Sequence, residues 1–174
     1  MKKKLTSGVH MKQISLMLIL LSLCIGCATQ SKYREKRRPF DPAEYAFVKL
    51  HGTSNIHGQI FVPRRTGGQN PCSGCEITLN PATVYSEEFY LKTVKNNIPI
   101  EEADLRVLNY IRKTISDDSG RFVFKNIGEG KYYLYSPISY DFPKPGGGYQ
   151  KINAYVYQSI YIREGQTLKV ELSR

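Results

Sequence analysis

The side chains best suited to metal or redox chemistry form a Cys-x-x-Cys pair, Cys72 and Cys75, in the stretch PCSGC. This spacing occurs in redox sites and zinc sites, and cysteines this close also form short-range disulfides in oxidising compartments. A redox pair needs a helix N-terminus to lower a thiol pKa, whereas a strand pattern follows Cys75. A zinc site needs two more ligands, for which only His51 and His57 remain. We therefore expect Cys72 and Cys75 to form a structural disulfide. The alternatives are two unpaired thiols and a redox or metal site.

The familiar signatures of catalysis are missing from the sequence. There is no Gly-x-Ser-x-Gly nucleophile motif and no phosphate-binding glycine loop. The acidic pairs Glu101–Glu102 and Asp117–Asp118 are adjacent in sequence, so on a strand their side chains point to opposite faces. We interpret the first pair as the start of a helix and the second as turn chemistry. The sequence therefore predicts no catalytic residues, no metal, no cofactor and no enzymatic activity.

The first 26 residues are typical of a secretory signal. Lysines at positions 2, 3, 4 and 12 precede the apolar run ISLMLILLSLC, and small residues follow it. The exit, LCIGCATQ, resembles a bacterial lipobox, in which a small residue precedes a cysteine that becomes acylated and N-terminal. Gly26 before Cys27 fits this pattern, while Leu23 before Cys24 fits it poorly. We expect lipid on Cys27, with an ordinary cleaved signal as the alternative.

The resemblance to lipoproteins also implies a location. Ala28 rather than Asp follows Cys27, which by that resemblance favours the outer membrane, with the domain facing the periplasm or the cell surface. Several acyl chains on one cysteine hold a protein on a membrane much better than one chain does. The basic stretch SKYREKRRP follows, and we expect residues 27–50 to be a polar tether near anionic head groups. A plain solvated linker is the alternative, and we expect no nucleic acid partner.

Short stretches of alternating apolar and polar residues predict an all-β domain over residues 51–174. They lie at 56–62, 75–79, 111–116, 121–125, 131–136, 152–158, 159–162 and 167–173. Turn residues such as DDSG and NIGEG separate them, and 13 Tyr and 7 Phe suit strands. We expect an antiparallel sandwich of seven or so short strands, with a partly helical insertion at 82–110.

The stretch DDSGRFVFKNIGEGKYYLY at 117–135 predicts a structural hairpin. Phe122 and Phe124 share one face of the first strand, and Tyr132 and Leu134 share one face of the second. This run, with HGQIFV upstream and EGQTLKVEL at the end, resembles the carboxypeptidase regulatory-like domain, a transthyretin-like Greek-key sandwich. The resemblance covers residues 55–173, and its core and turn motifs imply the fold rather than an activity.

The expected lipid anchor, the sandwich fold and the missing catalytic motifs favour two functions from different classes. The first is a membrane-anchored, non-catalytic envelope module that acts structurally or binds another protein. The second is a glycan-binding module, because related sandwiches are often used in this way and sugar rings stack on exposed aromatics. For either function we predict a binding loop at 137–149, with Tyr140, Phe142 and Tyr149 as its candidate contact residues.

Replacing Cys27 by Ser should release the protein from membranes and abolish lipid attachment, because the thiol is the expected acceptor of the acyl chains. Metabolic labelling with a fatty acid, followed by membrane fractionation, measures both effects. Labelling that persists in the Cys27→Ser variant and disappears in a Cys24→Ser variant would identify Cys24 as the acceptor instead.

Overall fold

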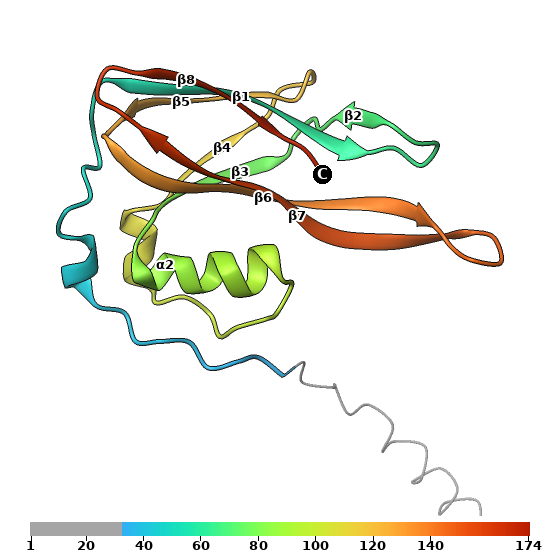
Figure 1. Cartoon of the computed structure of the whole chain (residues 1–174), viewed down its shortest axis with the longest axis horizontal. Coiled ribbons are helices and arrows are strands. Elements are labelled where there is room, and N and C mark those ends of the chain that lie inside the picture. The colour runs from blue at the N-terminus through green and yellow to red at the C-terminus, as the bar shows by residue number, and fades with distance from the viewer. Residues whose placement is uncertain (1–32) are drawn as a thin grey trace, which may run out of the picture. The chain divides into compact units, whose positions relative to one another are not determined.

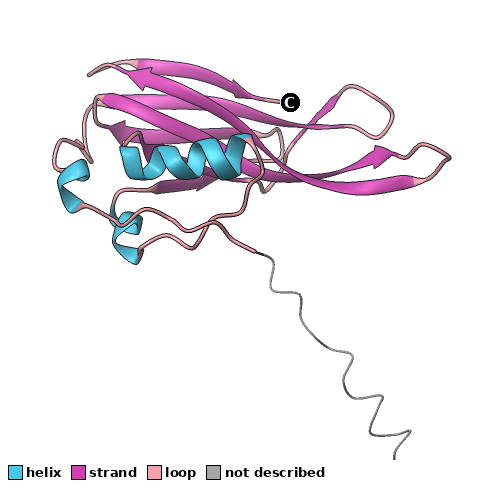
Figure 2. Ribbon diagram, turned by 60° about the horizontal axis from the view of Figure 1, so that its bottom comes forward, coloured by secondary structure: helices cyan, strands magenta, loops and turns pink. Residues whose placement is uncertain are grey.

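The structure, a computed structural model, describes residues 33–174, and residues 34–174 form one compact unit (Figures 1 and 2). The expected signal segment at 1–26 and the expected acylation site at Cys27 lie outside the described residues. No helix within 33–174 is long and apolar enough to cross a membrane.

Two four-stranded sheets make up the domain. The first contains β1 (Ser54–Pro63), β2 (Gln69–Pro71), β5 (Arg121–Ile127) and β8 (Thr167–Leu172); the second contains, in spatial order, β4 (Arg112–Ile115), β3 (Glu76–Pro81), β6 (Gly130–Pro143) and β7 (Tyr149–Ile162). The all-β sandwich is confirmed, but it has eight strands rather than seven. The stretch 152–162, which we expected to form two strands, belongs to the single strand β7, and the short β2 lies in what we expected to be a turn.

The pairing within the sheets is antiparallel except at one place. β8 runs parallel to β1, with Asn55 opposite Thr167 and Ile60 opposite Leu172. A parallel neighbour cannot be joined by a tight hairpin, so the chain reaches β8 only after crossing from the second sheet. The C-terminal strand therefore closes one side of β1, and β5 pairs along its other side.

The core lies between the sheets, and the hairpin that we expected at 117–135 supplies much of it. Phe122, Phe124, Tyr132 and Leu134 are each no more than 5% exposed, so their predicted inward orientation is confirmed. They pack with isoleucines and valines of β1, β3 and β7 in one apolar cluster. Burial of this kind is the main favourable term in the stability of the domain.

A glycine makes room for one of these rings. Gly58 lies directly opposite Phe122 across the β1–β5 pair. A Cβ atom at Gly58 would lie far inside the van der Waals contact distance of the Phe122 ring. The ring therefore occupies the space that any other side chain at position 58 would need.

The segment 137–149 is not a loop, which corrects the expectation from the sequence. β6 continues to Pro143 and β7 begins at Tyr149, so only residues 144–148 form the turn of a long hairpin (Figure 1). Beyond Tyr135, β6 no longer pairs with β3, and β7 is its only strand neighbour in the described chain. A proline such as Pro137 is tolerated there because the other side of the strand has no ladder to maintain.

The predicted helical insertion is confirmed, and it covers the outer face of the second sheet (Figure 2). It consists of α2 (Val84–Phe89), a π-helical continuation η2 (Tyr90–Lys95) and a short 3-10 helix η3 (Leu105–Asn109). Thr83 and Ser86 cap α2 reciprocally through side chain and backbone. Tyr90 stacks on Tyr133 of β6, with ring centroids 4.1 Å apart.

Residues 34–50, which we call the strap, lie across this helix before the chain enters β1 (Figure 1). The strap includes the 3-10 helix η1 (Pro42–Tyr45), and Tyr45 is only 2% exposed. Tyr45 packs with Tyr85 of α2 and Val107 of η3 in a small separate core. Part of the segment that we expected to be a tether therefore packs with the domain that we expected to begin at residue 51.

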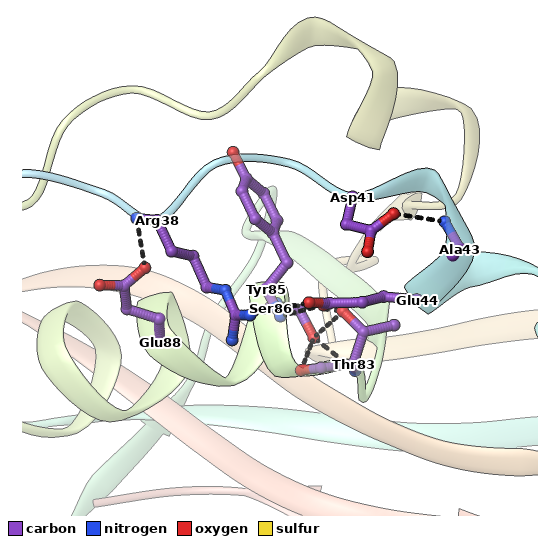
Figure 3. Close-up of polar contacts among 8 residues, drawn as sticks. All are labelled: Arg38, Asp41, Ala43, Glu44, Thr83, Tyr85, Ser86 and Glu88. Carbon is purple, nitrogen blue, oxygen red and sulfur yellow. Dashed lines mark hydrogen bonds and ion pairs between the residues drawn. The ribbon is translucent and has the colours of Figure 1, made fainter.

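Two partly buried carboxylates hold the strap on the helix (Figure 3). Glu88 accepts a hydrogen bond from the backbone N–H of Arg38 at 3.0 Å. Glu44 pairs with the Arg38 guanidinium at 2.9 Å and accepts from the N–H of Tyr85 at 2.7 Å, in the first turn of α2. An anion placed there is favoured by the partial positive charge of the helix N-terminus.

Two further basic residues of the strap, Arg34 and Arg37, also contact the domain. The Arg37 guanidinium lies 4.2 Å from the centre of the Tyr85 ring, and Arg34 pairs with Glu102 at 3.3 Å. Lys36 carries no such contact among the described residues. These contacts engage three of the four described strap cations that we expected near a lipid surface.

The pKa of Glu88 shows how these contacts combine. Burial raises the pKa, but the hydrogen bonds from the Arg38 backbone and from Lys92, with the nearby positive charges, outweigh burial and lower it below its ordinary value of 4.5. A carboxyl whose pKa is lowered in the folded state contributes stability above its unfolded pKa. That stability is lost as the pH falls through the lowered folded value.

Replacing Gly58 by Ala should destabilise the domain by about 1–3 kcal/mol, because the added methyl group forces the Phe122 ring out of its packed position. The melting temperature should fall by about 2–4 °C for each kcal/mol in a domain of this size. A double-mutant cycle with Phe122→Leu is the control, since a smaller side chain at position 122 should tolerate the added methyl group better. If the effects of Gly58→Ala and Phe122→Leu on the free energy of unfolding are strictly additive, the two positions are not in contact.

Replacing Glu88 by Gln should loosen the strap at pH 7, lowering the hydrogen-exchange protection of the Arg38 amide about tenfold, because a hydrogen bond to a charged group contributes about 1.5 kcal/mol or more. The wild type should lose this protection only as the pH falls below 4.5 towards the lowered pKa of Glu88. Glu76→Gln, at the exposed Lys113 ion pair, is the matched control. Equal protection in all three proteins would show that Glu88 does not hold the strap.

Candidate binding groove at the edge of strand β7

The three aromatic residues predicted to form a binding loop lie on the β6–β7 hairpin, but they do not converge. Residues directly opposite in an antiparallel pair share a face of the sheet. Tyr140 and Phe142 face the same side as their partners Ile152 and Gln150, whereas Tyr149 is opposite Pro143 and faces the other side. The hairpin therefore places two of the predicted residues, Tyr140 and Phe142, on one face of the sheet and the third, Tyr149, on the other.

Contacts within the chain engage two of these rings. Tyr140 is partly buried against the main core, and the Arg174 guanidinium lies 5.9 Å from its ring centre. Arg65, on the turn between β1 and β2, lies 4.3 Å from the centre of the Tyr149 ring and forms an ion pair with Asp141. Phe142 is 53% exposed and has no such partner within the described chain. These contacts join the β1–β2 hairpin to the β6–β7 hairpin, and the three predicted residues do not form a common site.

A hollow with the size of a ligand site lies at the base of the same hairpin, along the free edge of β7. Its volume is about 460 Å³, within the range of about 300–1,000 Å³ that is usual for ligand pockets. Its walls come from the end of η2, from β7, and from the residues that follow β8: Val94, Lys95, Asn97, Ile152, Asn153, Ala154, Tyr155, Val156, Tyr157, Ser173 and Arg174. We call it the β7 groove.

The fold gives the groove two walls and a floor. The second sheet has the helical insertion on one face and the first sheet on the other, and β7 is the outermost strand between them (Figure 1). Lys95 and Asn97 therefore approach from the helix side, and Ser173 and Arg174 approach from the side of β8. The exposed edge of β7 lies between the two.

Helix packing fixes the tyrosines of the groove. Tyr155 is half-buried, with its ring set edge-on against Phe89 at 6.5 Å and against Tyr135 at 6.1 Å. Tyr157 packs edge-on against Tyr90 at 5.7 Å and remains 38% exposed. Burial raises the pKa of Tyr155, so its hydroxyl stays protonated near neutral pH. The groove thus offers held aromatic rings rather than flexible ones.

Its polar groups are left free by the rest of the described chain. Asn97 adopts a φ of 56°, a left-handed conformation that asparagine tolerates better than most residues. Its backbone N–H closes the helix by donating to the carbonyl of Thr93 at 3.0 Å. The side chains of Asn97 and Asn153 are exposed and make no hydrogen bond within residues 33–174. Two amides are therefore available to donate and to accept.

A second hollow, of about 590 Å³, lies over the outer face of β1, β5 and β8. It is more open than the β7 groove, and its lining combines polar residues such as His57 and Lys169 with apolar ones such as Val123. The aromatic ring among its lining residues, Phe122, is only 3% exposed and belongs to the core. It therefore offers no exposed aromatic ring on which a ligand could stack.

The cysteines and histidines do not assemble into a metal site. Cys72 and Cys75 are paired as a disulfide, with their Cα atoms 5.8 Å apart. Within residues 33–174, no three His, Cys, Asp or Glu side chains are grouped so as to hold a metal ion. His57 lies on the exposed face of β1, opposite Val123.

Sequence reasoning missed the groove, although part of its signal was present. Asn153, Tyr155 and Tyr157 alternate along one strand and so share a face, but aromatic residues in strands usually mean packing. Nothing in the sequence indicates that Lys95 and Asn97, about sixty positions earlier, lie beside them. That proximity depends on the packing of η2 against β7.

Comparison with known proteins identifies a solved structure of similar fold but no matching protein family. No protein-family model matches the chain, and no curated protein matches it. A solved structure from Pseudomonas aeruginosa, of a protein proposed to bind carbohydrate, is similar with a TM-score of 0.68 and 25% identity, over 79% of this chain and 99% of that one. The major pilin subunit of Bacillus cereus matches with a TM-score of 0.40 and 18% identity, over 70% of this chain and 30% of the pilin, too weak a similarity for any argument. The β-sandwich is thus shared with the Pseudomonas protein, whereas the resemblance to carboxypeptidase regulatory-like domains rests on the sequence motifs alone.

Proposed function

We propose that this protein is a non-catalytic carbohydrate-binding module of the bacterial cell envelope, held on the outer membrane by lipid on Cys27. The observation that carries the proposal is the β7 groove, in which an exposed tyrosine ring and two free amides line a hollow of about 460 Å³. The anchoring rests on the N-terminal sequence pattern, and the binding rests on the groove.

The groove has the groups that sugar recognition requires. A pyranose presents an apolar face of C–H groups and a rim of hydroxyls. The face can lie on an aromatic ring such as Tyr157, and the rim can bond to side chains that both donate and accept, such as Asn97 and Asn153. The similarity to a Pseudomonas aeruginosa protein that is itself proposed to bind carbohydrate supports the same choice.

A binding role suits the groove better than a hydrolytic one. Glycoside hydrolysis generally uses two carboxyl groups on either side of the bond that breaks. None of the residues that line the β7 groove has a carboxylic side chain. The lining of the groove therefore supports a binding role more than a hydrolytic one.

A second candidate, a protein-interaction module, is favoured by a different property of the same strand. β7 runs for 14 residues at the edge of its sheet and, within the described chain, pairs with β6 alone. An extended peptide can add to such an edge through backbone hydrogen bonds. The free edge of β7 could accept such a peptide. Strand addition, however, gives no role to the aromatic and amide side chains that line the β7 groove.

Replacing Tyr157 by Ala should weaken binding to a cognate oligosaccharide at least about tenfold, equivalent to about 1.4 kcal/mol, because the ring face on which the sugar lies is removed. Full-length protein in detergent would be screened on a glycan array, and the hits measured by calorimetry. Tyr161→Ala is the matched control: Tyr161 is on the same face of β7 and is 56% exposed, but lies outside the groove.

Two results would count against the proposal. Oligosaccharide binding that Tyr161→Ala weakens as much as Tyr157→Ala would place the site elsewhere. A protein partner crosslinked to the edge of β7, with no glycan bound at all, would favour strand addition.

A further inference from the structure

The two charged side chains of the β7 groove are both basic, and this points beyond a generic sugar. Lys95 and Arg174 line the groove, both are exposed, and neither forms an ion pair within residues 33–174. No residue that lines the groove has an acidic side chain. No acidic side chain of the groove lining therefore compensates the charges of these two cations.

The two cations approach from opposite sides of β7. Lys95 is the last residue of η2, on the wall formed by the helical insertion. Arg174 follows β8, on the wall formed by the first sheet. A chain of sugars lying along the edge of β7 would therefore pass between a lysine and an arginine while one of its rings lies on Tyr157.

The position of Arg174 is braced without being neutralised. Its main-chain oxygen accepts a hydrogen bond from the side chain of Gln69 at 3.0 Å. Its guanidinium lies 5.9 Å from the centre of the Tyr140 ring, a contact that leaves the charge intact. Tyr140, which the sequence suggested as a sugar contact, instead supports a residue of the groove.

We propose, building on the carbohydrate-binding role above, that the β7 groove is specific for acidic oligosaccharides that carry carboxylate groups, as uronic acids do. An arginine can hold a carboxylate through two parallel hydrogen bonds, and a lysine supplies a second charge-assisted bond. Tyr157 and the two asparagines bind the neutral parts of the chain. The aromatic residues thus account for affinity towards sugars in general, and the cations account for the choice among them.

The test compares two ligands that share a sugar backbone, one with charged carboxylates and one in which methyl esters remove the charge. An oligogalacturonate and its fully methyl-esterified form share one sugar backbone, but only the first carries carboxylates. The full-length protein in detergent should bind the acid form more tightly, and this preference should shrink as ionic strength rises, because salt screens exposed charges.

Variants then assign the preference to the two cations. Lys95→Gln and Arg174→Gln should each weaken binding of the acid form by about fivefold, the upper end for an exposed ion pair, and should leave the ester unchanged. Lys169→Gln removes the same charge on the outer face of the first sheet and is the matched control. It should alter neither ligand.

The outcomes separate this inference from the function on which it rests. If Tyr157→Ala weakens both ligands but the acid and the ester bind equally, the groove binds carbohydrate and the preference for acids is overturned. A loss in Lys169→Gln equal to that in Lys95→Gln would reduce the effect to net charge and overturn it as well. If no glycan, acidic or neutral, responds to Tyr157→Ala, the proposed function itself fails.

Discussion

The pairing of β6 with β7 is the interaction on which the rest of this structure depends. Fourteen consecutive residue pairs join the two strands. On one face of this ladder Tyr132, Leu134 and Val156 enter the core between the sheets. On the other face Tyr133 and Tyr135 form the surface on which the helical insertion packs. A shift of one residue would exchange these faces, so the same register fixes both the core and the position of the helix.

The β7 groove exists because the helical insertion is packed against β7. α2 and η2, with 6 residues each, together reach only about the lower limit for a helix that is stable without tertiary contacts. Three features compensate for this: the cap that Thr83 forms on α2, the stacking of Tyr90 on Tyr133, and the strap. The result is that Lys95 and Asn97 are held beside a free strand edge.

The local parts of this fold could be predicted from sequence, and the parts that depend on distant partners could not. Alternation at Phe122 and Phe124, bounded by turn residues, defines a buried strand without further information. The prolines and glycines between Pro137 and Gly148 suggest a loop, but strand continuation there is dictated by a partner on only one side. The parallel β8 and the meeting of Lys95 with Tyr157 arise from topology, and a single sequence carries no local signal for either.

The strap has a mechanical consequence for a protein expected to be attached at its N-terminus. Tension applied to the chain ahead of Arg34 would first load the ion pair of Arg34 with Glu102 and the backbone bridge between Glu35 and Ile100. The contacts of Arg38 with Glu88 and Glu44 would follow. These contacts lie between the point of pull and β1, which begins only at Ser54. They can break one after another while the sandwich stays intact, so the strap would absorb a pull on the anchor before the force reached the two sheets.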